Sequence, residues 1–96
     1  MSTSIEGQIV EIGTSGSLIT DIKNDQLTAV PHDESTSIKF DAHTTVGIFP
    51  ADEEQPMGTL VARMGDSGCL EIEIVGMNLS EMLGIKVGEA VSVSTE

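Results

Sequence analysis

Short stretches in which apolar and polar residues alternate recur along the chain, about 8–12 residues apart, between clusters of Gly, Pro, Asn, Asp and Ser. The clearest is residues 69–75, where Leu70, Ile72 and Ile74 alternate with two glutamates. A period of two residues is typical of a strand with one face in the core and the other in water. The pattern therefore predicts a protein built of short strands.

The same alternation predicts further strands at residues 4–12, 18–23, 36–41, 46–49, 59–64 and 90–95. Within the first of them the apolar parity slips between Ile9 and Val10, which indicates either a β-bulge or a strand buried on both faces. Residues 28–35 are expected to form an exposed loop, and turn residues separate the strands at 13–16, 24–25, 51–56 and 65–68. We expect an all-β fold, a small antiparallel β-barrel of about six to eight short strands, with residues 1–96 forming a single domain.

One segment, from Asn78 to Leu83, has the pattern of a short helix. Asn78 is a favoured N-cap residue, and Glu81 stands where a capping box needs an acidic side chain. The apolar residues of the segment fall on one face, and Gly84 fits a left-handed end. We expect this helix to cover one end of the barrel.

The charge balance excludes several classes of function. Sixteen acidic residues face four basic ones, for a net charge of −12 over 96 residues. Binding to DNA or RNA needs a basic stripe that displaces counterions, and an anionic membrane surface would repel the chain. No apolar run approaches the ~20 residues of a membrane span, and the polar start has no signal-peptide pattern. The one cysteine, Cys69, leaves no internal disulfide, so we expect a cytoplasmic protein.

Aromatic residues are scarce, since Phe40 and Phe49 are the only two. Pockets for nucleotides and other ring-containing ligands commonly use aromatic faces. The domain therefore has little with which to hold a ring.

The string from Gly65 to Gly68, with Asp66 and Ser67 between the glycines, resembles the nucleophile loop of trypsin-like proteases. That chemistry needs a histidine base and an orienting carboxylate on a much larger framework. A tight turn between two strands is the favoured interpretation, and we expect no catalytic residues in the chain.

Metal-ligating residue types are present but are not spaced as ligands. No pair of them has the spacing of a zinc site, and no stretch matches an EF-hand loop. The residues of these types are His32, Asp33, Glu34, Asp41, His43 and Cys69. We expect no metal site among them, and we interpret all of them except Cys69 as solvated loop charges.

Three stretches in the same order carry a family resemblance: residues 7–22 (GQIVEIGTSGSLITDI), 68–74 (GCLEIEI) and 83–91 (LGIKVGEAV). Together they resemble the C-terminal domain of the S-adenosylmethionine-dependent hydroxide adenosyltransferases and their chlorinase and fluorinase relatives. The resemblance runs from about Gly7 to Val93, and includes a Thr45-Val46-Gly47 segment where the family has Thr-aromatic-Gly.

This resemblance implies a small antiparallel β-barrel that, in the family, follows a larger N-terminal catalytic domain. The family's barrel loops close over a ligand held by a neighbouring subunit of a trimer. By resemblance, the chain corresponds to that barrel without the catalytic domain.

The chain departs from the family pattern at the positions that, in the family, contact the ligand. The family's Asp, Phe, Asn, bulky residue, middle aromatic and Ser are replaced here by Gly13, Ser15, Ser17, Ile19, Val46 and Asp66. The matching positions are instead those of turns and core: Gly16, Thr20, Ile22, Gly68, Leu70, Ile72, Leu83, Gly84, Gly88 and Val91. Losing several stacking faces and hydrogen-bond partners weakens binding by orders of magnitude, so the family's mode of adenosyl binding is not expected.

The leading hypothesis is a non-catalytic module that associates with itself, a homotrimer by analogy, or with a protein partner, without a cofactor. One alternative is a degenerate module for adenosine or S-adenosylmethionine, and its candidate ligand-binding residues are Gly16, Ser17, Asp66, Ser67 and Gly68. A weaker one is an oxyanion site, because residues 80–91 are also similar to molybdate-binding barrel modules. The last is the accessory half of an S-adenosylmethionine-dependent enzyme whose catalytic domain is a separate protein.

Overall fold

The computed structural model describes residues 3–50 and 53–95 of the chain. Its strands are β1 (Thr3–Ile12), β2 (Leu18–Lys23), β3 (Thr36–Phe40), β4 (His43–Val46), β5 (Phe49–Pro50), β6 (Leu60–Met64), β7 (Cys69–Ile74) and β8 (Ala90–Thr95). Two short helices complete the fold, α1 (Asn24–Leu27) and α2 (Leu79–Leu83).

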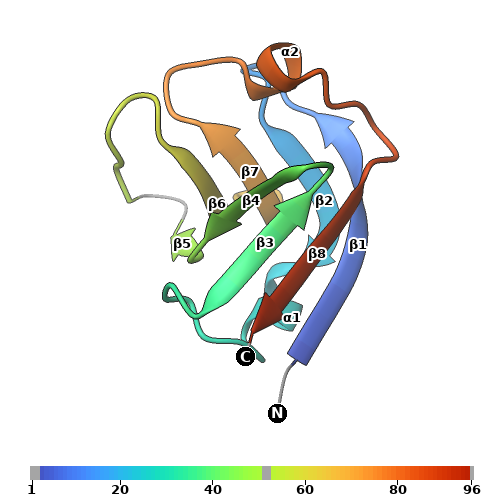
Figure 1. Ribbon diagram of the computed structural model, residues 1–96, viewed down its shortest axis with the longest axis vertical. Helices are drawn as coiled ribbons and strands as arrows, with labels where there is room; N and C mark the ends of the chain where they lie inside the picture. Colours follow the sequence, from blue (N-terminus) through green and yellow to red (C-terminus); the bar gives the residue numbers. More distant parts are fainter. Residues whose placement is uncertain (1–2, 51–52, 96) are drawn as a thin grey trace.

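The strands form one eight-stranded sheet in the order β4-β3-β8-β1-β2-β7-β6-β5. The sheet curls into a half-barrel, which brings β4 beside β6 (Figure 1). The Thr45 hydroxyl donates to the Leu60 carbonyl at 3.1 Å and so joins these two strands. The predicted all-β, barrel-like fold of six to eight strands is therefore confirmed.

The sequence led us to expect a sheet that is antiparallel throughout. One strand pair is instead parallel. Phe49 pairs with Arg63 and Pro50 with Met64 in a short parallel ladder between β5 and β6. All the other strand pairs are antiparallel.

Two predicted strands, 18–23 and 90–95, have the same limits in the structure. In β1 the register with β2 shifts between Ile9 and Glu11, which confirms the bulge. Val10 is 45% exposed, so the alternative of a strand buried on both faces is wrong.

The predicted strand at 46–49 is wrong. β4 ends at Val46, and β5 begins at Phe49. Between them Gly47 has a φ of +83°, outside the strand region, and its N–H donates to the Thr36 carbonyl at 2.9 Å. A glycine in this conformation breaks the run of β-branched and apolar residues that suggested one strand.

The helix expected from Asn78 to Leu83 is confirmed as α2. The Asn78 side chain accepts a hydrogen bond from the Glu81 N–H at 3.0 Å, and Gly84 ends the helix with a φ of +67°. Leu79 is fully buried and anchors the helix to the core.

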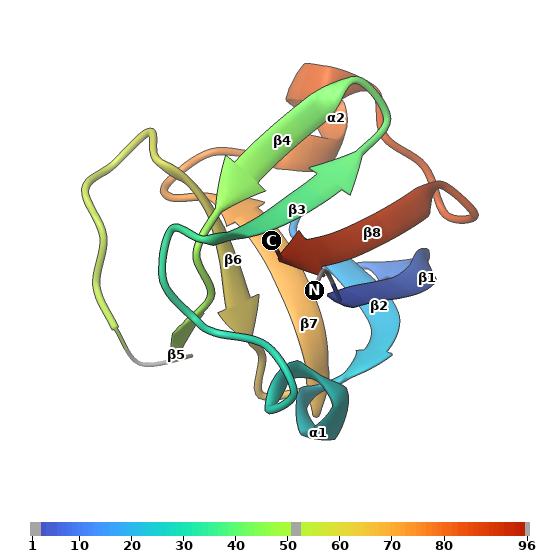
Figure 2. The ribbon, with the colours of Figure 1, turned by 60° about the horizontal axis from the view of Figure 1, so that its bottom comes forward.

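The second helix, α1, replaces the simple turn predicted at 24–25. The Gln26 side chain accepts a hydrogen bond from the Lys23 N–H at 2.9 Å, and Leu27 is fully buried. Asn and Asp favour both turns and helix starts, so these two residues could not distinguish one from the other. The helices lie at opposite ends of the sheet (Figures 1 and 2).

The core fills the inside of the curled sheet. Leu70 and Ile72 of β7 are fully buried and Ile74 is 9% exposed, as their alternation predicted. Leu18, Ile38 and Val93 from other strands join them in a single cluster of buried side chains. Burial of alternate side chains leaves the intervening residues on the outer face.

The sheet opens between the first half of β1 and β2. Thr3 to Gln8 pair with β8, whereas the β2 ladder begins at Ile9. The Asp21 carboxylate accepts a hydrogen bond from the Gln8 N–H at 2.9 Å. A side chain at Gly7 would overlap that carboxylate, so the glycine makes room for it.

Candidate functional site

Gly16 joins the β1–β2 turn to the start of α2. It is buried and has a φ of +86°, and a side chain there would overlap the Asn78 amide. Its carbonyl accepts a hydrogen bond from the Ser80 N–H at 3.0 Å. The first predicted ligand-binding residue is thus a joint between two elements of the fold.

Ser17 follows in the same turn. Its hydroxyl lies 3.4 Å from that of Ser15 and is partly exposed. A small hollow of about 250 Å³ next to this turn is lined by Ser15, Glu73, Ile74, Gly76, Met77 and Asn78. That volume is below the ~300–1,000 Å³ of usual ligand pockets.

The other three predicted residues lie in the β6–β7 turn. Asp66 is exposed, and the Ser67 hydroxyl donates to the Glu71 carboxylate at 2.8 Å. Gly68 has a φ of +89°, and its carbonyl accepts a hydrogen bond from the Asn24 N–H at 2.9 Å. Ser67 is therefore bonded to a carboxylate, not to the histidine that a protease nucleophile needs.

Asn24 fastens this turn to α1. Its side-chain amide donates to the Gly65 carbonyl at 3.1 Å. Its Oδ1 atom is buried and has no hydrogen-bond partner within the described residues. A buried acceptor of this kind can take a hydrogen bond from water.

The two turns lie at opposite ends of β2. Leu18 pairs with Ile72 and Lys23 with Cys69, so the β1–β2 turn is at one end of the strand pair and the β6–β7 turn is at the other. A six-residue strand spans about 20 Å at ~3.3 Å per residue. Gly16 and Ser17 lie together in the β1–β2 turn, and Asp66, Ser67 and Gly68 lie together in the β6–β7 turn. Within one chain these two groups of residues are separated by the length of β2. Ligand binding at either turn stays a prediction.

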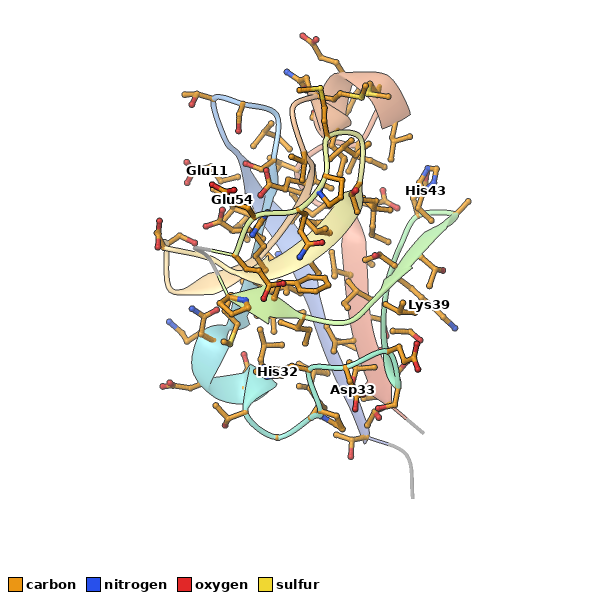
Figure 3. All side chains as sticks on the ribbon, turned by 90° about the vertical axis from the view of Figure 1, so that its left-hand side faces the viewer. Glu11, His32, Asp33, Lys39, His43 and Glu54 are labelled. Carbon is orange, nitrogen blue, oxygen red and sulfur yellow. The ribbon has the colours of Figure 1, made fainter. Side chains whose placement is uncertain are left out.

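The residues weighed as metal ligands are spread over the molecule. His32 and Asp33 lie near α1, and His43 lies at the far end of β3 and β4 (Figure 3). The His32 ring is 2.9 Å from the Leu27 carbonyl, and the His43 ring packs 5.7 Å from that of Phe40. Across residues 3–50 and 53–95, no three metal-ligating side chains gather.

Asp33 lies in the loop after α1 and accepts two hydrogen bonds from Ser35. The Ser35 hydroxyl and then the Ser35 N–H donate to its carboxylate, and these hydrogen bonds lower the pKa of Asp33. Asp33 is exposed, and the two bonds fix the conformation of the loop after α1.

Arg63 has a structural role that the sequence did not reveal. Its side chain is 11% exposed and forms an ion pair with Glu73 at 2.5 Å. It also donates to the carbonyls of Pro50 and Glu53. The arginine ties the connection after β5 to β6 and β7, and no local pattern marks it as different from the other basic residues.

A larger hollow was also missed by sequence analysis. It has a volume of about 560 Å³ and is lined by Glu6, Gly7, residues 39–41 and residues 89–92, which lie on β1, β3 and β8 or directly beside them. Phe40 and Val91 are buried, so their strand neighbours Lys39, Ala90 and Ser92 point to the opposite, outer face of the sheet. The hollow therefore lies over this outer face. It forms where three segments distant in sequence meet.

Comparison with known proteins identifies the family of the chain. The SAM hydroxide adenosyltransferase C-terminal domain matches residues 7–92. The chain belongs to this family. The resemblance inferred from the three sequence stretches is confirmed, and no match was found among curated proteins.

Two solved structures share the fold of this SAM hydroxide adenosyltransferase C-terminal domain. An uncharacterized conserved protein from Thermotoga maritima matches with a TM-score of 0.75 and 21% identity, over 94% of this chain and 35% of that one. A conserved hypothetical protein from Thermus thermophilus matches with a TM-score of 0.67 and 23% identity, over 92% of this chain and 34% of that one. The chain therefore spans about a third of the length of these relatives.

The helices of the domain are short. Neither α1 nor α2, nor any other helix in the described ranges, is long and apolar enough to cross a membrane.

Proposed function

We propose that this domain is a non-catalytic β-barrel module that acts by binding protein, either a second copy of itself or a different partner. One observation carries the proposal: the two groups of candidate ligand residues lie at opposite ends of β2. The Gly16 carbonyl is bonded to α2, the Gly68 carbonyl is bonded to α1, and the Ser67 hydroxyl is bonded to Glu71. A fold stabilised in this way keeps its shape without a bound ligand.

Sedimentation velocity over a range of protein concentrations tests self-association. Because each chain carries a net charge of −12, screening the repulsion should strengthen association as salt is raised. We expect a concentration-dependent increase in sedimentation coefficient at high salt. A monomer at both low and high salt would remove self-association from the proposal.

The length of the solved relatives favours a second candidate. The matched region is 35% and 34% of those chains, so a family domain is followed or preceded by a larger region there. On this second proposal, the module completes a site on a larger protein that has the chemistry the module lacks. Mixing it with the purified larger region of a relative should give a stable complex, with activity only after mixing. Repeated recovery of the module alone would count against this candidate.

A further inference from the structure

The 560 Å³ hollow over β1, β3 and β8 has a floor of small side chains. Ala90 and Ser92 of β8 form this floor and point outwards from the sheet. Ser94 continues the line of small residues along β8, and it is paired with Ser4 of β1 and with Ser37 of β3. These last three residues, here called the serine row, lie beside the hollow. A partner segment in extended conformation can therefore lie along β8, close to the sheet.

The walls of the hollow are mostly acidic. Glu6 stands on β1, Asp41 directly follows β3, and Glu89 directly precedes β8. Glu6 and Asp41 are exposed, and Glu89 is half-buried. Lys39 of β3, which projects away from the sheet in Figure 3, is the only basic residue of the lining within the described residues. Three carboxylates thus surround the hollow together with one ammonium group.

The charged groups around the hollow form no ion pair within residues 3–50 and 53–95. The one ion pair found in these ranges joins Arg63 of β6 to Glu73 of β7. Carboxylates around a concave surface reinforce one another's negative potential, and a cation that enters the hollow lowers their mutual repulsion. The hollow is therefore electrostatically suited to a positively charged group.

The spacing of the carboxylates fits an extended organic cation and not a metal ion. Glu6 lies on one side of β8 and Asp41 beside the strand on its other side, so their Cα atoms are at least two strand spacings, roughly 10 Å, apart. Oxygen ligands must come within about 2.6 Å of a bound calcium ion, and no three metal-ligating side chains gather in the described part of the chain. Lysine and arginine side chains instead combine an apolar stem, which can rest on Ala90, with a charged end that reaches the walls.

We propose that the hollow and the serine row form a docking surface for an extended segment of a partner protein that is rich in lysine or arginine. The inference rests on the part of the proposed function in which the module binds a different protein, and it assigns that binding a surface and a partner chemistry. Charge complementarity supports this occupant, since the acidic walls attract its cations and the net charge of −12 attracts a basic partner from a distance. A second copy of this acidic chain would be repelled at the same surface.

Fluorescence anisotropy with a labelled peptide in which lysine alternates with threonine tests this docking surface. Alternate side chains of an extended peptide point the same way, so all of its lysines can face the hollow. The wild-type chain should bind this peptide at low ionic strength and lose affinity as salt is raised. A peptide of the same length with glutamate in place of lysine should not bind.

Neutral variants of the walls separate recognition by the hollow from attraction by the whole chain. The double variant Glu6→Gln with Asp41→Asn should weaken peptide binding at least fivefold. Asparagine suits position 41 because it tolerates a positive φ, which is +53° there. The control Glu11→Gln with Glu54→Gln removes the same charge from exposed positions on the opposite side of the molecule from Lys39 in Figure 3, and should weaken binding less than twofold.

Lys39→Gln should change binding in the opposite direction. It removes the one ammonium group of the described lining, so the peptide should bind at least twofold more tightly. Lys23→Gln makes the same change of charge at an exposed position on β2 and should have a smaller effect. Circular dichroism should show that all the variants are folded.

The outcomes distinguish this inference from the proposed function. Loss of binding in the wall variant alone, with a gain in Lys39→Gln, would support the docking surface. No peptide binding, or equal effects in the wall variant and its control, would overturn it and leave the proposed function to the sedimentation and mixing experiments. Displacement of the peptide by spermine at equal concentration would also overturn it, because the hollow would then take free organic cations. A chain that binds no peptide and forms no complex in those other experiments would overturn both.

Discussion

The two ends of the sheet are built alike but are held in place differently. At each end a glycine turn with a positive φ is fastened to a short helix, by Gly16 and α2 at one end and by Gly68 and α1 at the other. A side chain on Gly16 would overlap Asn78, whereas a side chain on Gly68 would meet nothing within 4 Å. The α2 end is thus fixed by backbone conformation and packing together, and the β6–β7 turn by backbone conformation and hydrogen bonds.

The comparison shows that the same residue type can be required for different reasons. Both glycines match the family pattern, and both were interpreted from sequence as turn residues. Only the contacts of Asn78 show that replacing one of them moves a helix as well as a turn.

Gly16→Ala should have the largest effect on stability. The methyl group adds conformational strain of about 1–2 kcal/mol and a clash worth a further ~1–3 kcal/mol, so we expect a loss of about 3 kcal/mol in the free energy of unfolding. Urea unfolding followed by circular dichroism measures this. A loss below about 1 kcal/mol would show that the joint with Asn78 is loose.

Gly68→Ala should cost less, about 1–2 kcal/mol, because only the backbone strain applies there. The same unfolding experiment provides the comparison. A loss equal to that of Gly16→Ala would contradict the distinction between the two ends.

Asn78→Ala removes the N-cap of α2 and should cost about 1 kcal/mol. Asn78→Asp keeps an acceptor for the Glu81 N–H and should retain most of the stability. Thermal unfolding of both variants beside the wild type measures the difference. Equal losses in the two variants would show that the hydrogen bond from the Glu81 N–H is not what the side chain at position 78 contributes to stability.

The smallest change in stability should come from protonation of Asp33, in the loop after α1, at low pH. The pKa of Asp33 is lowered in the folded state, so its contribution to stability is present above the unfolded pKa of about 3.9 and is lost as the pH falls through the folded value. Ser35→Ala removes the hydroxyl donor and should reduce this part of the acid sensitivity. Unfolding midpoints between pH 5 and pH 2 for both proteins test it, and identical curves would show that the Ser35 bond has no effect.

Features encoded by neighbouring residues were predictable from the sequence. The alternation in β2, β7 and β8 and the cap and stop of α2 each depend on a few adjacent side chains. The strand predicted at 46–49 failed because the left-handed conformation of Gly47 outweighed the β-forming residues beside it. The start of α1 used the same residue types as a turn.

The arrangement of the candidate site was not predictable in the same way. Gly16 and Gly68 are both strand-end turn residues, and only the register of β2 with β7 places them about one strand length apart. The 560 Å³ hollow over β1, β3 and β8 likewise depends on two ladders that join residues far apart along the chain. Pairing of this kind is set by the packing of the whole sheet, not by any local sequence pattern.

The Asp21 carboxylate at the opening between β1 and β2 has a consequence for aggregation. It occupies the Gln8 N–H, a donor that an incoming strand would use to extend the sheet at the unpaired edge of β1. An inserted strand would also bring its backbone carbonyls against a negative charge. The space left by Gly7 thus lets one acidic side chain protect the edge against templated growth into fibrils.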